Sequence, residues 1–117
     1  RDADWLRMMQ QRYDYMMYRQ DLPGFGEPAA GAWDGWARIN TDTRFGGIVG
    51  VFRHGAIEDS RKIAVPGLDA GRRYQVSSAP EGKPVATMTG HELMNKGFPV
   101  QGDKLYDGWL FEIRRLP

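Results

Sequence analysis

The sequence contains no cysteine, which excludes disulfide bonds, thiolate metal sites and thiol nucleophiles but leaves the cellular compartment open. Its two histidines, His54 and His91, are far apart, and neither has a second histidine or a carboxylate at metal-ligand spacing. No apolar run approaches the ~20 residues that a membrane-spanning helix needs. The sequence therefore predicts no metal site, no bound cofactor and no membrane partner.

An excess of charge of one sign is also missing, because 16 basic and 15 acidic residues leave a formal net charge of +1. A nucleic-acid-binding protein needs a basic stripe that faces the phosphates, and most arginines here stand among acids. The basic doublets Arg61-Lys62, Arg72-Arg73 and Arg114-Arg115 are more typical of strand edges. We therefore expect no nucleic-acid partner.

The size and composition predict one domain plus a short appendage, since 41% of the 117 residues are hydrophobic. The chain opens on Arg1 rather than on methionine, which predicts a segment of a longer protein. Three parts follow one another along it. Residues 1–22 carry a helical pattern, residues 23–32 form a linker rich in glycine and proline, and residues 33–117 carry a strand pattern.

The helical part has its apolar side chains on one face. They recur at spacings of three or four residues, at Leu6, Met9, Tyr13, Met16 and Met17. The pattern predicts a helix over 2–20, which Leu22-Pro23-Gly24 ends. A helix of this length is marginal in water by itself, so we expect its apolar face to dock on another surface.

The remaining residues alternate between apolar and polar and are divided by turns. Strands are predicted at 36–41, 48–53, 63–65, 74–78 and 109–113, with a hairpin connection at 42–47. Thr89 and Glu92 have the spacing of a capping box, which predicts a short helical turn near 90–96 that Gly97 ends. The predicted fold is mainly β: an antiparallel, Greek-key-like β-sandwich of about seven or eight strands behind one N-terminal helix.

A search for catalytic residues identifies none. Glycoside hydrolysis needs two carboxyl groups that flank the scissile bond. Most acids here stand in predicted turns or caps, and the adjacent pair Glu58-Asp59 would point to opposite faces of a strand. No serine stands in a nucleophile elbow, and no glycine-rich loop leads from a strand into a long helix. The chain itself is therefore predicted to be inactive.

The aromatic residues suggest a different kind of site. Exposed tryptophan rings can stack on sugars, and Trp33 and Trp36 are the candidates for such a contact. They are separated by an odd number of residues, so on one strand they would face opposite sides. At least one of the two is then expected in the core.

Four stretches of the β-rich part resemble the C-terminal β domain of family 36 α-galactosidases, the melibiases. IAVPGLDAGRRYQV at 63–76 is similar to that domain's strand, Gly-Leu-Asp turn and following strand. GHELMNKGFPV at 90–100 resembles its helical turn, and GVFRHGAIEDSRKI at 50–63 the preceding strand pair. WDGWARIN at 33–40 is similar to the segment that leaves the catalytic domain.

The resemblance implies a parent enzyme in which a catalytic (β/α)₈ barrel precedes this domain. It implies that residues 1–22 are the last helix of that barrel, which would explain an apolar helix face without a partner in its own segment. The two catalytic aspartates of such enzymes lie at the C-terminal ends of barrel strands. No motif that carries them is present here, so no catalytic residue is transferred.

The predicted function is that of a non-catalytic accessory domain that packs against the barrel and stabilises a glycoside hydrolase. One alternative is a carbohydrate-binding module that uses exposed tryptophans. Another is an interaction domain that forms homo-oligomers through the helix face. The residues expected to form the core of the β domain are Trp36, Val51, Phe52, Ile63, Leu68, Tyr74, Leu93, Met94, Trp109 and Phe111.

Overall fold

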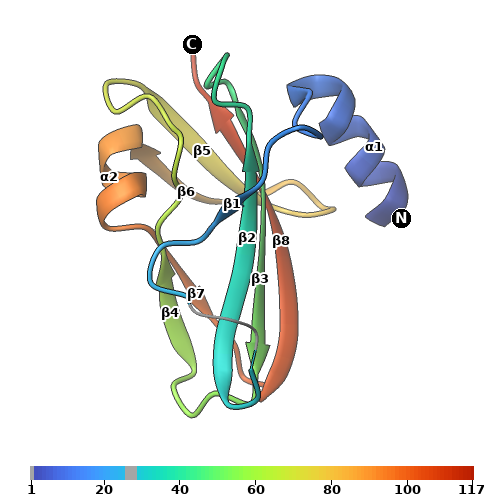
Figure 1. The fold of residues 1–117 in the computed structure, drawn as a ribbon, viewed down its shortest axis with the longest axis vertical. Helices are drawn as coiled ribbons and strands as arrows, with labels where there is room; N and C mark the ends of the chain where they lie inside the picture. Colours follow the sequence, from blue (N-terminus) through green and yellow to red (C-terminus); the bar gives the residue numbers. More distant parts are fainter. Residues whose placement is uncertain (1, 26–28) are drawn as a thin grey trace.

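The computed structural model describes residues 2–25 and 29–117, and within them it shows a mainly β protein with a helix at one side (Figure 1). Both helices are shorter than a bilayer crossing requires, and no helix in the described residues is long and apolar enough for one. The elements in chain order are α1 (Asp2–Tyr13), β1 (Gln20–Asp21), β2 (Ala32–Ile39), β3 (Gly46–His54), β4 (Ser60–Ile63), β5 (Arg73–Ser78), β6 (Lys83–Thr89), α2 (Gly90–Asn95), β7 (Phe98–Gln101) and β8 (Tyr106–Arg115).

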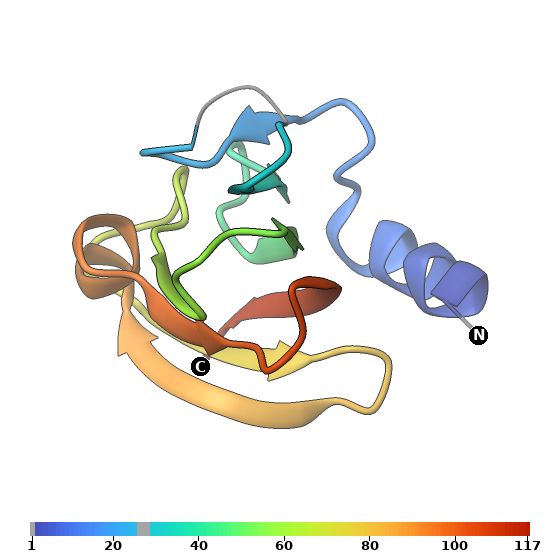
Figure 2. The same cartoon turned by 90° about the horizontal axis from the view of Figure 1, so that it is seen from below.

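Six of the strands form one antiparallel sheet in the order β1-β2-β3-β8-β5-β6, and β4 and β7 form a second, two-stranded sheet. The prediction of a mainly β, antiparallel fold with about seven or eight strands is confirmed. The two sheets differ in size, and the small one therefore covers only part of the curved inner face of the large one (Figure 2). α1 and α2 lie at opposite sides of the molecule.

The main core lies between the two sheets. Side chains alternate along each strand, so every second residue of β2, β3, β5 and β8 points inward. These residues meet Ile63 of β4 together with Phe98 and Val100 of β7. The inward residues of the large sheet are Trp33, Ala37, Ile39, Val49, Val51, Tyr74, Val76, Phe111 and Ile113.

Most of the predicted core residues belong to this cluster. Six of them are buried there: Val51, Ile63, Leu68, Tyr74, Leu93 and Phe111. Met94 and Trp109 are partly buried against the same cluster. Trp36 and Phe52 were expected in this core, but both lie on the opposite, outer face of the sheet and are half-buried. Successive side chains of a strand point to opposite faces, and this alternation places Trp36 and Phe52 on the face of the sheet opposite to Val51.

The N-terminal helix is shorter than predicted and ends at Tyr13 instead of Gln20. Asp14 adopts a left-handed conformation with φ 51°, and its N–H donates to the carbonyl of Gln10, as at a helix end. The buried Asn40 amide donates to the carbonyls of Tyr13 and Asp14 at 2.9 and 3.2 Å and so satisfies groups that a longer helix would have used.

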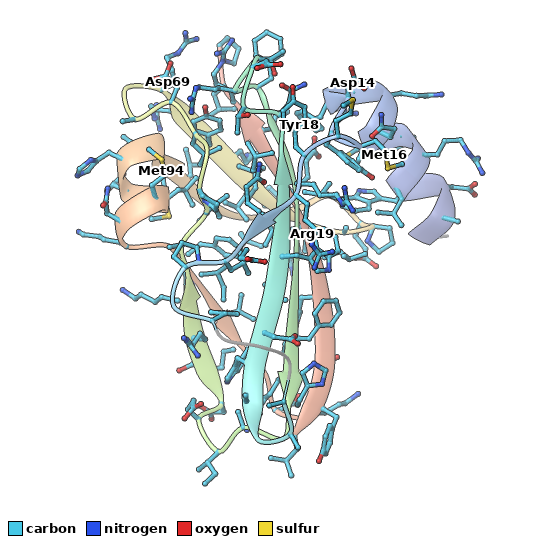
Figure 3. All side chains as sticks on the ribbon, viewed as in Figure 1. Asp14, Met16, Tyr18, Arg19, Asp69 and Met94 are labelled. Carbon is cyan, nitrogen blue, oxygen red and sulfur yellow. The ribbon has the colours of Figure 1, made fainter. Side chains whose placement is uncertain are left out.

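The residues after this helix end take other conformations. Met16 and Met17, which were expected on the packed face, stand in a turn and are exposed. The side chains of Met16 and Tyr18 extend from this segment between α1 and β1 (Figure 3). Gln20 and Asp21 then pair with Ala37 and Trp36 as edge strand β1. Of the predicted linker, Phe25 packs against the main core, whereas 26–28 lie outside the described residues.

The helix docks on the sheet of its own chain, contrary to the expectation that its partner is missing. Trp5, Met9 and Tyr13 form a second buried cluster with Tyr15 and Ile48, against which Trp36 and Leu110 pack. Polar contacts join the same surfaces, since Arg12 and the Tyr13 hydroxyl both donate to the Glu112 carboxylate of β8. The predicted apolar face of Leu6, Met9 and Tyr13 is thus used within the chain.

The short helix near 90–96 is confirmed as α2, together with its predicted cap. The Thr89 hydroxyl accepts from the Glu92 N–H at 3.0 Å, and the Glu92 carboxylate accepts from the Thr89 N–H at 2.9 Å. The Thr89 backbone N–H, and next the Thr89 side chain, lower the pKa of the Glu92 carboxyl below its ordinary value. Gly97 follows the helix in a left-handed conformation, as predicted.

We expect the docking of α1 to weaken at alkaline pH. Burial, and next the hydrogen bond to Glu112, raise the pKa of the Tyr13 hydroxyl. In the unfolded chain the Tyr13 hydroxyl loses its proton near pH ~10, whereas in the folded chain it keeps the proton to higher pH. The stabilisation that the protonated hydroxyl contributes is therefore fully present below pH ~10 and is lost as the pH rises further. Tyr13→Phe should cost ~1 kcal/mol at pH 7 and should lose less stability than the wild type between pH ~10 and ~12. Urea unfolding across this range measures both; an equally steep fall in the two proteins would contradict the assignment.

Candidate functional site

The outer face of the large sheet consists of four rows of side chains that run across β2, β3 and β8. The strand register places in each row one residue from each strand. From the α1 end of the sheet, the rows are Arg38–Ile48–Glu112, Trp36–Gly50–Leu110, Asp34–Phe52–Gly108 and Ala32–His54–Tyr106.

The helix covers the first two rows. Ile48 belongs to the buried cluster under α1, and Trp36 and Leu110 pack against that cluster. In Figure 1, α1 stands beside the upper part of β3 and β8, and the lower part of both strands extends beyond it. The last two rows lie beyond the helix. We call four of their side chains, Asp34, Phe52, His54 and Tyr106, the outer platform.

The Phe52 ring uses the space that a neighbouring position leaves free, because that position is a glycine. A Cβ atom added to Gly108 would come within 2.9 Å of the Cδ1 edge of the Phe52 ring, so this edge lies over the glycine. The His54 ring stacks beside that of Phe52, with the ring centroids 6.3 Å apart and 22° between the planes. The two rings are thus nearly parallel, and both belong to the outer face of the sheet.

A polar pair borders this surface. The Nε2 atom of His54 lies 3.1 Å from the Oδ1 atom of Asp34, which stands diagonally opposite on β2. The Asp34 side chain is 11% exposed, whereas that of His54 is 41% exposed. The carboxylate is thus held at the base of the site and the imidazole at its rim. A carboxylate accepts hydrogen bonds from hydroxyl groups, and an imidazole can both donate and accept.

A cleft lies at the end of the platform that His54 and Tyr106 form, and Phe52 and Asp34 do not line it. An open cleft of about 350 Å³ is lined by Ala29, Ala30, His54 and Tyr106. The Tyr106 ring lies against the backbone at Gly55, where an added Cβ atom would be 3.0 Å from its hydroxyl oxygen. The cleft lies at the small end of the size range of ligand sites. It combines apolar walls with a few polar groups, which is the usual composition of such sites.

Of the two predicted sugar-contact residues, Trp33 is only 2% exposed. Its ring stacks on that of Trp109 with centroids 5.6 Å apart, and its Nε1–H donates to the carbonyl of Glu58 at 3.0 Å. This burial argues against a sugar contact at Trp33. Trp36 is half-buried on the outer face, beside the platform, and its role stays a prediction. The inference that the two residues face opposite sides is confirmed.

A buried arginine supports the loops at the platform end of the sheet. The guanidinium of Arg53 donates to the carbonyls of Ala56 and Ile57 in the loop after β3. It also donates to the carbonyls of Gly102 and Lys104 in the loop before β8. Arg53 therefore fixes the loop that leads directly into Tyr106.

The described residues hold no group of three or more histidines, cysteines or carboxylates that could bind a metal ion. His54 and His91 are separated as expected, since His91 lies on exposed α2 and contacts Asn95. Asp34 is the one buried carboxylate in the described part of the chain. Glu58 and Asp59 are both exposed. The described residues of the outer platform contain one carboxylate, whereas glycoside hydrolysis requires two.

Sequence reasoning did not find the outer platform. His54 was treated only as a possible metal ligand, and Phe52 was assigned to the core. The sequence does contain a signal that brings three of these residues together, because the predicted hairpin at 42–47 sets the register of its two strands. That register places Asp34 opposite Phe52 and diagonally next to His54. The contribution of Tyr106 depends on β8, which lies next to β3 although it is far from it in sequence.

Comparisons with known proteins give a similarity of fold. No family model matches the sequence, and no curated protein does. Among solved structures, the fold is similar to the "galactosidase domain of alpha-galactosidase-sucrose kinase, AgaSK", with a TM-score of 0.57. The chain shares the fold of part of a galactosidase domain. The match has 20% sequence identity and covers 72% of this chain but only 11% of that chain. The resemblance to α-galactosidases is confirmed at the level of the fold.

Proposed function

We propose that this chain is a non-catalytic accessory domain of a glycoside hydrolase of the galactosidase type, and that it stabilises the catalytic part of the same protein. The observation that carries the proposal is the shared fold with a segment of the AgaSK galactosidase domain, a chain about nine times as long as the matched segment. An isolated fold of this kind inside a larger domain is suited to packing against its remainder.

The chemistry of the described residues supports the non-catalytic part of the proposal. Retaining and inverting glycosidases both need two carboxyl groups on either side of the bond. Asp34 is the one buried carboxylate of the described residues, and it is engaged by His54. A single carboxylate in contact with a histidine does not provide the acid and the nucleophile or base that either mechanism requires.

The surface supports the packing part. Several large apolar side chains are exposed at the α1 side of the molecule, among them Met8, Met16 and Met17. The inner face of the helix is already used on the sheet, so these methionines are free to meet a further domain. An interface between domains of one chain typically buries 600–1,500 Å² and includes such side chains at its centre.

The test has two parts. The 117-residue chain alone should release no p-nitrophenol from p-nitrophenyl α-D-galactopyranoside. The product of the complete gene should hydrolyse this substrate, and deletion of residues 33–117 from it should lower its melting temperature by ~5 °C or more, because the packed surface is lost. Hydrolysis by the isolated chain would contradict the non-catalytic role. An unchanged melting temperature after the deletion would contradict the stabilising role.

A further inference from the structure

We propose that copies of this chain associate head to tail through the two ends of the large sheet. One end consists of the loops at 55–59 and 102–105, and we call it the loop end. The other consists of the β2–β3 connection, the turn before β5 and the last residues of β8, and we call it the arginine end. The two lie at opposite ends of the longest axis of the molecule (Figure 1).

The loop end presents apolar side chains on a rigid support. Ile57 is 94% exposed, and Leu105 and the adjacent Tyr106 are 55% and 68% exposed. The N–H of Gly55 donates to the carbonyl of Leu105 at 2.6 Å, and buried Arg53 donates to carbonyls of both loops. Large apolar side chains that are exposed together mark a contact surface. A surface that is already held in place loses less entropy when a partner binds.

Acidic side chains surround these apolar ones. Glu58, Asp59 and Asp103 are exposed, and Asp107 follows at the start of β8. The cation that the two loops contain is Lys104. The ion pairs of the described residues are formed by other side chains, so these carboxylates are available to a partner. The loop end therefore suits a surface that combines an apolar group with several cations.

The arginine end has the opposite charge. Its five arginines form no ion pair within the described residues, and all but the half-buried Arg115 are exposed: Arg44, Arg72, Arg73, Arg114 and Arg115. The strand register pairs Arg114 with Gln75 of β5, so Arg73 lies diagonally beside Arg114 on the outer face. The printed side-chain bond of Arg114 is to neutral Gln75, at 3.1 Å. These like charges lie side by side without a carboxylate between them.

The acids at the arginine end already have partners in the chain. The Asp42 carboxylate accepts from the Tyr18 hydroxyl, and that of Asp69 accepts from the N–H of Gly71. An apolar group is present as well, because Phe45 is 48% exposed, with the guanidinium of Arg115 4.3 Å from its ring centroid. A nucleic-acid backbone would meet the charges but not the phenyl ring. The loop end of a second copy offers both carboxylates and apolar side chains.

The shapes of the two ends determine how the copies assemble. The contact joins two different surfaces, so each copy keeps one end free for a further copy, and the association does not stop at a dimer. The molecule measures 38 × 31 × 25 Å along its principal axes. An end can therefore bury on the order of 600 Å² per copy, which is at the low end for a specific interface, and we expect a Kd of about 0.1 mM.

Sedimentation equilibrium of the 117-residue chain tests the proposal. The weight-average mass should rise beyond that of a dimer as the concentration increases from about 0.01 to about 1 mM. Raising the salt concentration from about 0.05 to about 0.5 M should weaken the association at least about fivefold, because the charges are screened. A constant monomer mass, a plateau at the dimer mass or an association that salt does not weaken would each overturn the proposal.

Charge-reversed variants test which surfaces meet. Arg72→Glu with Arg73→Glu changes the arginine end, and Glu58→Arg with Asp59→Arg changes the loop end. Each double variant should associate at least about tenfold more weakly than the wild type. An equimolar mixture of the two should regain association, because the intact loop end of the first meets the intact arginine end of the second. A mixture that stays as weak as its components would contradict the head-to-tail contact.

The matched control reverses two charges away from both ends. Arg19 lies at mid-height of the molecule (Figure 3), and Lys83 begins the edge strand β6. Arg19→Glu with Lys83→Glu should stay within about threefold of the wild-type association. Circular dichroism shows whether each variant is folded, and the single changes Arg73→Glu and Asp59→Arg replace a double variant that is not.

The inference goes beyond the accessory role, because it concerns contacts between copies of the chain. Its failure is also distinct from failure of that role. Association is measured on the isolated chain as a mass, whereas the accessory role is measured as a melting temperature of the complete gene product.

Discussion

Replacement of Arg53 by methionine is expected to destabilise the protein by about 3–5 kcal/mol. Arg53 is 4% exposed, and its guanidinium is the donor for carbonyls in two separate loops. Methionine keeps much of the apolar stem but leaves these carbonyls without their donor. Each buried polar group that loses its partner costs ~1–3 kcal/mol, and bonds from charged donors are at the upper end.

Urea unfolding, followed by tryptophan fluorescence, measures this effect. Arg114→Met is the matched control, because Arg114 is exposed and donates only to the Gln75 side chain at 3.1 Å. It should change the free energy of unfolding by less than ~0.5 kcal/mol. Arg53→Lys should give an intermediate loss, since a single ammonium cannot replace the planar fork of donors. A loss below ~1 kcal/mol in Arg53→Met would contradict the role of the guanidinium as the tie between the loops.

The consequence of Arg53 for the outer platform is geometric. The loops that it fixes present Ile57, which is 94% exposed, and Leu105, which precedes the platform residue Tyr106. A loop with exposed apolar side chains has little packing of its own to hold it. Arg53 points to the inner face of the sheet, so its hydrogen bonds hold these loops in place without occupying the outer face.

The strands with a clear apolar pattern were predicted well. The strand predicted at 48–53 is apolar on both faces, and β3 indeed lies between β2 and β8, with the main core on one face and the cluster under α1 on part of the other. The capping box of α2 was found because its signal lies within four consecutive residues, Thr89 to Glu92. Local hydrogen-bond chemistry of this kind depends little on the rest of the fold.

The features that were missed depend on contacts between distant residues. The end of α1 is set by Asn40, whose amide reaches the carbonyls of Tyr13 and Asp14 from another element. The sequence near Tyr13 gives no sign of this cap, so the apolar spacing of Met16 and Met17 predicts a longer helix. Strand β6 lies at the sheet edge and is largely exposed, and it begins with Lys83 and Pro84, so its alternation is weak.

The assignment of faces shows how far periodicity alone can go. It correctly separated Trp33 from Trp36, because successive side chains of a strand alternate. It did not show which of the two faces the main core would occupy. That choice depends on where β4 and β7 pack, and their apolar residues Ile63, Phe98 and Val100 cover the side of Trp33. The same choice moved Phe52 from the expected core to the outer platform.

Trp33→Ala is expected to cost about 3–5 kcal/mol, as is usual for truncation of a large buried aromatic side chain. The ring is 2% exposed, stacks on Trp109, and donates to the Glu58 carbonyl, so the change leaves a cavity and an unsatisfied carbonyl near the platform end. Thermal and urea unfolding measure the loss. Ile57→Ala, at a 94% exposed apolar residue of the same region, is the control and should stay within ~0.5 kcal/mol of the wild type.

A double-mutant cycle with Trp109→Ala isolates the stacking of the two rings. Their planes differ by 14°, so we expect a coupling energy of ~0.5–1.5 kcal/mol beyond the loss of buried area. Strictly additive effects would contradict an energetic contribution from the stack. A large loss in Trp33→Ala would show that this buried ring holds together the sheet that carries the outer platform, because Trp33 lies on the inner face of that sheet.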